Sequence, residues 1–304
     1  MTTVTIDHLL SRVAKPARYT GGEFNSVTKD WDRATARFVL AYPDAYDIGM
    51  SNMGIGILYD ILNKLDDVVC ERTFAPWDDM EQEMRREGIP LWSLETRHPA
   101  READMLGFTL QYEMNYTNVL NMLDLAGIPV WSKERTSEHP IVIAGGSGAF
   151  NPEPMAPFID AFVMGEGEDA VVELAAMLRS WKQTNASREE RLRDLVAMPG
   201  MYVPAFYEAR YDAENHFAAL EPTIPEAPAV VTRRIVETLP PALVKPIVPF
   251  LQTVHDRAAV EIQRGCTQGC RFCQAGMIYR PTRERSPEEV VEATRQLMAN
   301  TGYD

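Results

Sequence analysis

The sequence has 304 residues, of which 45% are hydrophobic and 24% are charged, and its formal net charge is −14. These values are ordinary for a soluble globular protein, and the length leaves room for two domains. The acidic balance disfavours non-specific binding to nucleic acid or to anionic membranes. The first residues, MTTVTIDHLLSRV, lack the basic region, apolar run and small-residue cleavage site that mark a signal peptide, and no apolar run approaches the length of a membrane span. We therefore expect a cytoplasmic protein with no membrane partner.

The first two thirds of the chain alternate between strand and helix patterns. Residues 1–35 show no firm periodicity, and we interpret them as an N-terminal arm packed on the domain after it. Within residues 36–200 the apolar pattern predicts strands at 37–43, 68–70, 91–94, 105–109 and 141–144, and helices at 50–65, 77–87 and 112–125. Residues 166–198 are also predicted to be helical, with a capping box at Ser187 and Glu190. This alternation predicts an α/β domain with a mainly parallel, doubly wound sheet. Such sheets bind ligands at the carboxyl ends of their strands.

The last third of the chain changes character. Residues 201–257 are rich in proline and are predicted to form a connector with room for a small hairpin. Residues 258–304 then predict a strand at 258–263, a cysteine-rich loop and a helix that begins at Ser286, with Glu289 completing a capping box. A single strand–loop–helix unit cannot bury its own apolar faces. We therefore expect the chain to be the N-terminal part of a longer protein.

The stretch VEIQRGCTQGCRFCQAGM contains three of the four cysteines, Cys266, Cys270 and Cys273, in the spacing C-x3-C-x2-C. Thiolates are the usual protein ligands of iron–sulfur clusters and of zinc. Zinc needs a fourth ligand, but Cys70 lies in the other domain and His255 precedes the predicted strand. A four-iron cluster held by three thiolates leaves one iron open to a small molecule. The residues alone leave both metals open and favour iron.

Five arginines surround the cysteines and locally reverse the acidic balance of the chain. Between residues 258 and 285 they outnumber the two glutamates Glu261 and Glu284; they are Arg264, Arg271, Arg280, Arg283 and Arg285. They form either a solvated face or a positive field around an anionic cofactor or substrate. Sequence spacing does not decide between the two.

The motif C-x3-C-x-aromatic-C after a predicted strand resembles the radical S-adenosylmethionine (SAM) superfamily. The resemblance implies that Cys266, Cys270 and Cys273 hold a [4Fe-4S] cluster and that residues 258–304 begin a (β/α) barrel. It also implies that SAM binds the open iron, with Phe272 near its adenine. Reductive cleavage of SAM would yield a 5'-deoxyadenosyl radical, with an electron donor such as flavodoxin or ferredoxin as partner.

The α/β half resembles the cobalamin-binding-domain subgroup of that superfamily, whose sheet is of the flavodoxin type. The stretches YPDAYDIGMSN, GFTLQYEMNYTN and CRFCQAGMIYRPTRERSPEE look close to an uncharacterised branch of it. Cobalamin proteins that ligate cobalt from below carry D-x-H-x-x-G in the first loop. This chain has Asp44-x-Tyr46-x-x-Gly49, and tyrosine in place of histidine puts axial ligation in doubt.

Two glycine-containing loops complete the candidates in the α/β half. Gly145 and Gly146 would let a cobalamin nucleotide tail approach the backbone, or they merely make a tight strand–helix turn. The stretch Gly165-Glu166-Gly167-Glu168 is expected to start the next helix, where carboxylates are favourable. Three isolated histidines beside proline or charged residues are expected at the surface: His98, His139 and His216.

The leading hypothesis is a radical SAM iron–sulfur enzyme, with or without cobalamin, whose substrate and reaction the sequence does not specify. One alternative keeps the radical SAM chemistry and makes the α/β domain a substrate or partner platform without cobalamin. Another is an iron–sulfur or zinc protein with a structural or electron-transfer role.

Overall fold

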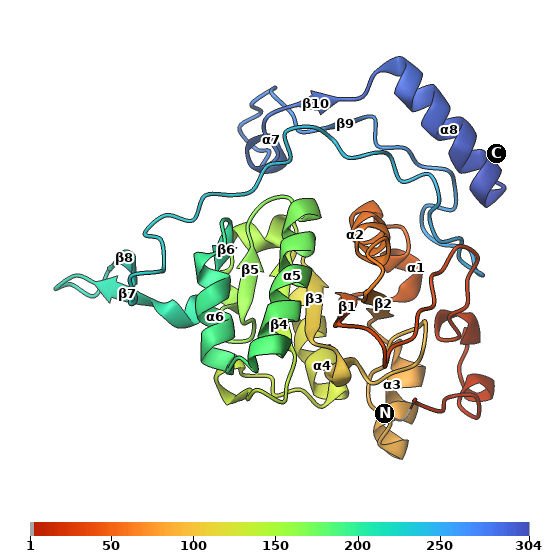
Figure 1. Cartoon of the computed structure of the whole chain (residues 1–304), viewed down its shortest axis with the longest axis horizontal. Coiled ribbons are helices and arrows are strands. Elements are labelled where there is room, and N and C mark those ends of the chain that lie inside the picture. The colour runs from red at the N-terminus through yellow and green to blue at the C-terminus, as the bar shows by residue number, and fades with distance from the viewer. Residues whose placement is uncertain (1–2, 304) are drawn as a thin grey trace.

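The computed structural model describes residues 3–303 and contains a central six-stranded sheet (Figure 1). Its strands are β1 (Ala36–Tyr42), β2 (Val68–Phe74), β3 (Met105–Thr109), β4 (Ile141–Gly145), β5 (Ala161–Val163) and β6 (Met201–Tyr202). The spatial order is β2-β1-β3-β4-β5-β6, and all neighbours are parallel except β5 and β6. The first five strands follow the order of flavodoxin-like sheets. The predicted α/β class with a mainly parallel sheet is confirmed.

Helices cover both faces of this sheet. One face packs against α2 (Met53–Asn63), α5 (Glu168–Thr184) and α6 (Arg188–Ala197). The other packs against α3 (Asp78–Glu87) and α4 (Tyr116–Ala126). Strand β1 contributes to both cores, because Phe38 and Leu40 belong to the first and Val39 and Ala41 to the second. The continuous apolar run in β1 therefore accounts for a sheet that is buried on both sides.

Shorter elements occupy the connections and the N-terminal arm. The arm contributes Ile6, Leu9 and Trp31 to the core beneath α3 and α4. The short helices are α1 (Tyr46–Gly49), η1 (Leu10–Arg12), η2 (Pro16–Arg18), η3 (Ala100–Glu102), η4 (Glu113–Asn115), η5 (Ser132–Glu134), η6 (Ser147–Phe150), η7 (Glu153–Met155) and η8 (Pro204–Phe206). Within residues 3–303, none of the helices is both long and apolar enough to cross a membrane.

The helical structure predicted over 166–198 is confirmed, including the capping box of Ser187 and Glu190: Asn185 adopts a left-handed conformation (φ 52°) after α5, and α6 starts at that box. One strand prediction in the α/β half is wrong. The strand expected at 91–94 is only an isolated bridge between Trp92 and Pro99. Apolar runs this short do not distinguish a strand from a buried loop.

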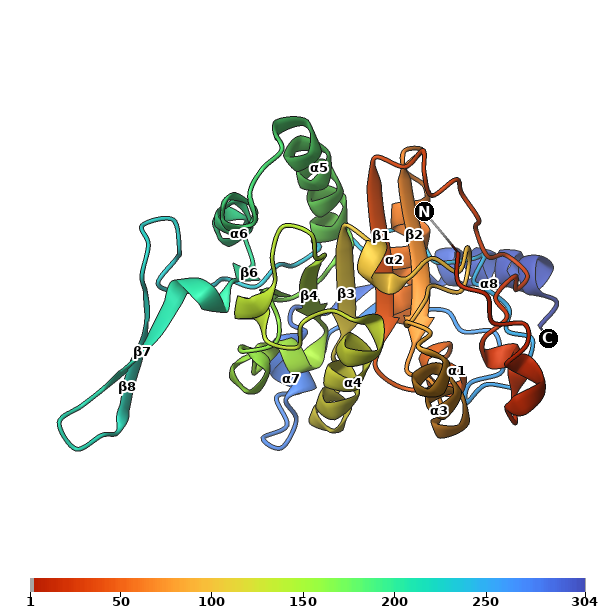
Figure 2. The same ribbon diagram turned by 90° about the horizontal axis from the view of Figure 1, so that it is seen from below.

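The C-terminal third departs from the sheet. An antiparallel hairpin of β7 (Tyr207–Tyr211) and β8 (Phe217–Pro222) projects away from the body (Figures 1 and 2). The chain then runs to β9 (Gln263–Arg264), α7 (Ala275–Ile278), β10 (Arg283–Glu284) and α8 (Pro287–Thr301). The strand expected at 258–263 is wrong, because β9 pairs only with the two residues of β10. Helix α8 begins as predicted, with the capping box of Ser286 and Glu289.

Candidate functional site

The three clustered cysteines lie on a loop that is closed at its base. Strands β9 and β10 pair antiparallel and bring the two ends of the loop together. Gly265 follows β9 with φ 89°, and a Cβ there would lie 2.3 Å from the carbonyl oxygens of both Tyr279 and Pro281. Only glycine allows this approach of the two arms. The loop therefore presents its cysteines from a defined base.

The cysteine sulfurs are accessible to a ligand. Cys270 is exposed, and Cys266 and Cys273 are half-buried. The backbone N–H of Gly276 donates to Cys273 Sγ at 3.4 Å, and the N–H of Cys273 donates to the carbonyl of Cys270 at 3.0 Å. Hydrogen bonds to sulfur are among the contacts by which proteins tune iron–sulfur centres. The donor set and its access fit an iron–sulfur cluster.

The three thiols are not gathered as closely as the ligands of a single ion. Among the described residues, the group of three ligand atoms within 4.8 Å of one another is Asp212, Glu214 and His216, and the cysteines form no such group. Thiolates that each bind a different iron need not converge as ligands of one zinc ion do. Cys70 is fully buried in β2, and burial raises its pKa well above the usual range. It is therefore not available as a fourth ligand.

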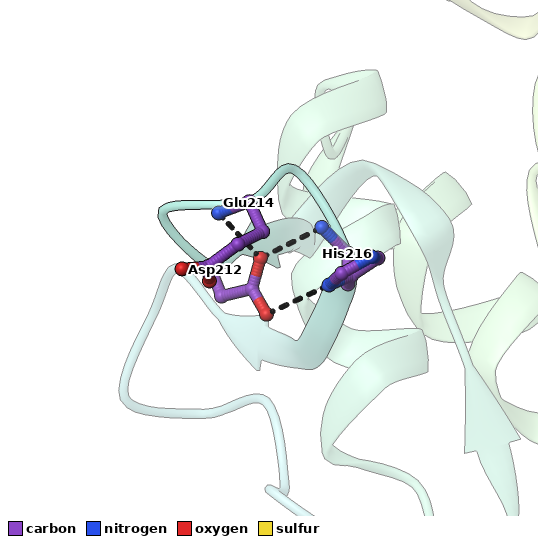
Figure 3. A group of neighbouring side chains, drawn as sticks. All are labelled: Asp212, Glu214 and His216. Atoms are coloured by element: carbon purple, nitrogen blue, oxygen red, sulfur yellow. Dashed lines mark hydrogen bonds and ion pairs between the residues drawn. The ribbon is translucent and has the colours of Figure 1, made fainter.

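The acidic group at the tip of the hairpin is explained by the turn itself. One Asp212 carboxylate oxygen accepts from the backbone N–H groups of Glu214 at 3.0 Å and His216 at 2.8 Å (Figure 3). The other oxygen lies 3.3 Å from His216 Nδ1. All three residues are exposed. This is the side-chain-to-backbone bonding by which aspartate stabilises a turn.

The segment around the cysteines is less positive than its arginine content indicates. Arg264, Arg283 and Arg285 all pair with carboxylates in the structure. Arg271 is exposed, as is Phe272, whose ring lies 92% open to solvent. The solvated-face interpretation thus describes Arg271, while the three paired arginines are explained by internal ion pairs.

The cysteine loop lies at the carboxyl edge of the sheet. Helix α7, which directly follows Cys273, contacts η6 after the end of β4. The loop after β5 is also engaged, because Arg283 reaches Glu166 and Arg264 reaches Glu168. The tertiary fold therefore brings together the ligand-binding edge of an α/β sheet and the three thiols, which the sequence had placed in separate domains.

Tyr46 lies beside the carboxyl ends of β1 and β2, but its hydroxyl is not free for a ligand. Its side chain is buried, its ring packs edge-on against Phe74, and its hydroxyl donates to Glu23 Oε1 at 2.8 Å. Burial and the carboxylate of Glu23 raise the pKa of Tyr46 far above its usual value. Glu23 also accepts from Arg72 at 2.9 Å. Tyr46 is therefore part of a buried polar cluster that ties the N-terminal arm to the sheet.

Two of the candidate glycines are required by the packing of the chain itself. Gly146 has φ 95°, and a Cβ there would lie 2.5 Å from the carbonyl oxygen of Leu110. A Cβ at Gly49 would lie 2.4 Å from the ring of Phe74. Gly145 differs, because its nearest neighbour, Val163, is at an ordinary 3.8 Å. The tight-turn interpretation accounts for Gly146.

Sequence reasoning missed the partners of Glu166 and Glu168. Glu168 does lie in the first turn of α5, as expected, but both carboxylates are buried and accept from arginines beyond residue 260. The sequence does contain a sign of this pairing, because Glu166 and Glu168 form an acidic group and the arginines near the cysteines form a basic one. Nothing local in the sequence links segments about a hundred residues apart.

The surface position expected for His98 is also wrong. The ring is buried and stacks on Trp31 with centroids 4.6 Å apart. Its Nδ1 lies 2.6 Å from Thr96 Oγ1. Burial lowers the pKa of His98 below its usual value. Its role is structural, in the core formed with the N-terminal arm.

A cavity of about 510 Å³ adjoins the base of the cysteine loop. It lies between α2, the connector around residues 240–261 and α8. Glu261 and Arg285, which flank β9 and β10, contribute to its wall, whereas none of the cysteines does. The cavity is therefore a neighbour of the cysteine site and separate from the thiols.

A doubly wound sheet with a three-cysteine loop at its carboxyl edge is the combination that we compared with known protein families. Residues 54–204 match the family model described as radical SAM proteins, N-terminal. This match lies outside the cysteine motif and supports a place for the chain in the radical SAM superfamily, whose members in general use a [4Fe-4S] cluster and SAM.

A curated relative shares much of this chain. An uncharacterized protein of Methanocaldococcus jannaschii is 23% identical over 260 residues. The aligned part covers 83% of this chain and 44% of that protein, so the chain spans less than half the length of its relative.

Proposed function

We propose that this chain belongs to a radical SAM enzyme that holds a [4Fe-4S] cluster on Cys266, Cys270 and Cys273. The observation that carries the proposal is the closed, accessible three-thiol loop, joined to a sheet that matches the N-terminal region of radical SAM proteins. When bound, such a cluster supplies the electron that cleaves SAM reductively to a 5'-deoxyadenosyl radical, and a flavodoxin or ferredoxin is the expected class of donor.

The chain's own residues have distinct parts in this proposal. The loop between β9 and β10 presents the thiols, and three thiolates leave one iron for the amino and carboxylate groups of SAM. Phe272 lies between two of the cysteines with its ring exposed, so that it is available to pack against the adenine. Residues 36–200 serve as the α/β domain, 201–257 as connector and 258–304 as the start of the barrel. The protein is assigned to the cytoplasm.

Two observations favour an α/β domain that works without cobalamin. Tyr46, at the position of the lower axial ligand, is buried and bonded to Glu23, and the space beside Gly146 is filled by the Leu110 carbonyl. The second candidate function is therefore a radical SAM protein whose sheet edge is a platform for substrate or partner. Binding of cobalamin to the intact protein, followed by its absorbance, decides between the two.

Iron analysis of anaerobically reconstituted protein tests the cluster. The wild type should hold one four-iron cluster, and replacing Cys266, Cys270 or Cys273 singly by alanine should remove most of the iron. Cys70→Ala is the matched control and should keep it, because Cys70 is buried in β2. Equal iron loss in the Cys70 variant would show that the site is misplaced.

The same preparation separates the enzyme from its alternatives. Zinc in place of iron would indicate a structural site. A reduced cluster that leaves SAM intact would indicate an electron carrier. Formation of 5'-deoxyadenosine from SAM by the reduced protein is the result expected of a radical enzyme.

A further inference from the structure

At the base of the cysteine loop, two like charges lie opposite each other. In the pairing of β9 with β10, Arg264 and Arg283 are direct cross-strand partners. Like charges placed opposite each other destabilise a strand pair, and a two-stranded ribbon is at best marginally stable in isolation. The pair that closes the cysteine loop therefore needs a source of negative charge.

Most of that negative charge comes from the α/β domain. Glu166 accepts from both terminal nitrogens of Arg283, each at 2.6 Å, in a bidentate pair. Glu168 Oε1 lies 2.6 Å from Nη1 of Arg264. Both glutamates are buried, as are most of the two arginine side chains. Bidentate, charge-assisted hydrogen bonds of this kind are the strong ones.

The C-terminal segment does not neutralise itself. Glu261 lies 2.9 Å from Arg264 Nε and 3.4 Å from Arg285 Nη2. Arg283 instead has its carboxylate partner in Glu166, and its remaining contacts are to backbone carbonyls. Without the α/β domain, the ribbon would retain unbalanced positive charge.

Glu166 is itself held rigidly. The backbone N–H of Val236 donates to Glu166 Oε2 at 2.6 Å, and the N–H of Glu166 donates to the carbonyl of Arg234 at 3.2 Å. The preceding Gly165 has φ 102°, and a Cβ there would lie 2.2 Å from that same carbonyl. The connector thus fixes the loop after β5 in the position where the Glu166 carboxylate contacts Arg283.

We propose that Glu166 and Glu168 are positioning residues that anchor the cysteine loop to the carboxyl edge of the sheet. Through Arg283 and Arg264 they close the base of the loop and set where its thiols meet the α/β domain. The contact of α7 with η6 is the second point of this attachment. The anchoring of the loop to the sheet does not depend on the proposed function, whereas the positioning of the cluster rests on it.

Hydrogen exchange of the intact, metal-free protein tests the anchor. In Glu166→Gln/Glu168→Gln, peptides covering residues 262–264 and 283–285 should exchange at least about tenfold faster, because Arg283 loses its carboxylate partner and Arg264 keeps only Glu261. Glu221→Gln is the control, since it breaks an Arg–Glu pair of 2.9 Å on the distant hairpin. It should leave the cysteine loop unchanged.

A second substitution tests whether the faster exchange comes from a lost charge balance or from a general destabilisation of the fold. Glu168→Gln alone should speed exchange at β9 and β10, and adding Arg264→Gln should restore protection, because the like charge opposite Arg283 is gone. Both of these variants keep Glu166, so they also serve if Glu166→Gln/Glu168→Gln does not fold. Exchange within about twofold of wild type after Glu168→Gln, or no recovery with Arg264→Gln, would overturn the proposal.

In the reconstituted protein, the spectrum of the cluster is a measurement that would not change if the two glutamates had a purely structural role. The reduced cluster in Glu166→Gln/Glu168→Gln should give an altered electron paramagnetic resonance spectrum, and the Glu221→Gln spectrum should match wild type. An unaltered spectrum would contradict positioning of the cluster. If the wild type binds no iron, the proposed function fails, while the exchange result still decides whether the anchor exists.

Discussion

At the scale of single residues, charge buried beside the sheet links three segments of the chain. Arg72 in β2 is buried and donates to Glu23 of the arm at 2.9 Å and to Glu95 at 2.6 Å. Burial alone would lower the pKa of Arg72, but the two carboxylates raise it above the usual range. Removing one partner of such a group leaves an uncompensated buried charge, which typically costs about 3–5 kcal/mol.

Glu71 makes a testable contribution to the pH dependence of stability. Burial and the nearby Glu95 raise the pKa of Glu71 from 4.5 to about 7. The folded state therefore binds the proton more tightly than the unfolded state, and the stabilisation present below pH 4.5 is lost as pH rises towards 7. We expect Glu71→Gln to flatten the free energy of unfolding over this window, measured by urea denaturation.

A Glu71→Gln protein whose stability still falls as steeply between pH 4.5 and 7 would place the titrating group elsewhere.

At the scale of elements, the loops after β3 and β4 are packed against each other. The N–H of Leu110 donates to the carbonyl of Gly145 at 2.7 Å, and the N–H of Gly148 donates to the carbonyl of Leu110 at 2.9 Å. Gly146 lies between these bonds with a positive φ. The carboxyl edge next to the cysteine loop is therefore a rigid surface, built from backbone contacts.

Replacing Gly146 tests this rigidity. In Gly146→Ala the new methyl group would meet the Leu110 carbonyl at 2.5 Å, so we expect the free energy of unfolding to fall by more than about 2 kcal/mol. Gly88 also has a positive φ, of 67°, but nothing lies within 4 Å of its Cβ position. Gly88→Ala should cost only about 1 kcal/mol. Equal losses in chemical denaturation would mean that the contact with Leu110 is unimportant.

At the scale of the whole molecule, the sheet domain and the cysteine segment are joined by an exposed connector. The hairpin of β7 and β8 is largely exposed, and between β8 and β9 the chain forms no strand of the main sheet. The connector touches the sheet domain at separate points: Arg234 pairs with Glu173 at 2.5 Å, and Val248 bridges Phe24 of the arm. Backbone with so few ladder hydrogen bonds opens easily.

Limited proteolysis should therefore cut first between residues 201 and 258. The early products, identified by mass spectrometry, should include an intact fragment that spans residues 36–200, because these residues supply most of both cores. First cuts in the middle of the α/β domain would contradict this division. The same digestion of Glu166→Gln/Glu168→Gln should release the cysteine segment faster, since its anchor is removed.

Local features of the chain were sufficient to predict several elements and to single out the cysteine cluster. The capping residues of α8, the alternation that builds the parallel sheet and the spacing of Cys266, Cys270 and Cys273 all act within a few residues, so the sequence displays them directly. The prediction of a strand at 258–263 is wrong because a strand depends on residues outside its own segment. A strand exists only where a neighbour pairs with it, and pairing is not a local property.

The tertiary structure alone decided how the site is assembled. Glu166 and Arg283 are 117 positions apart, and only the fold shows that the carboxylates after β5 balance the arginines of the cysteine loop. Likewise, the motif alignment placed Tyr46 at a ligand position, but burial against Phe74 and Glu23 gives it a structural role. Sequence determines which chemical groups are present and their local conformation. Burial and long-range pairing determine which of them face a ligand, because both depend on segments that meet only in the folded chain.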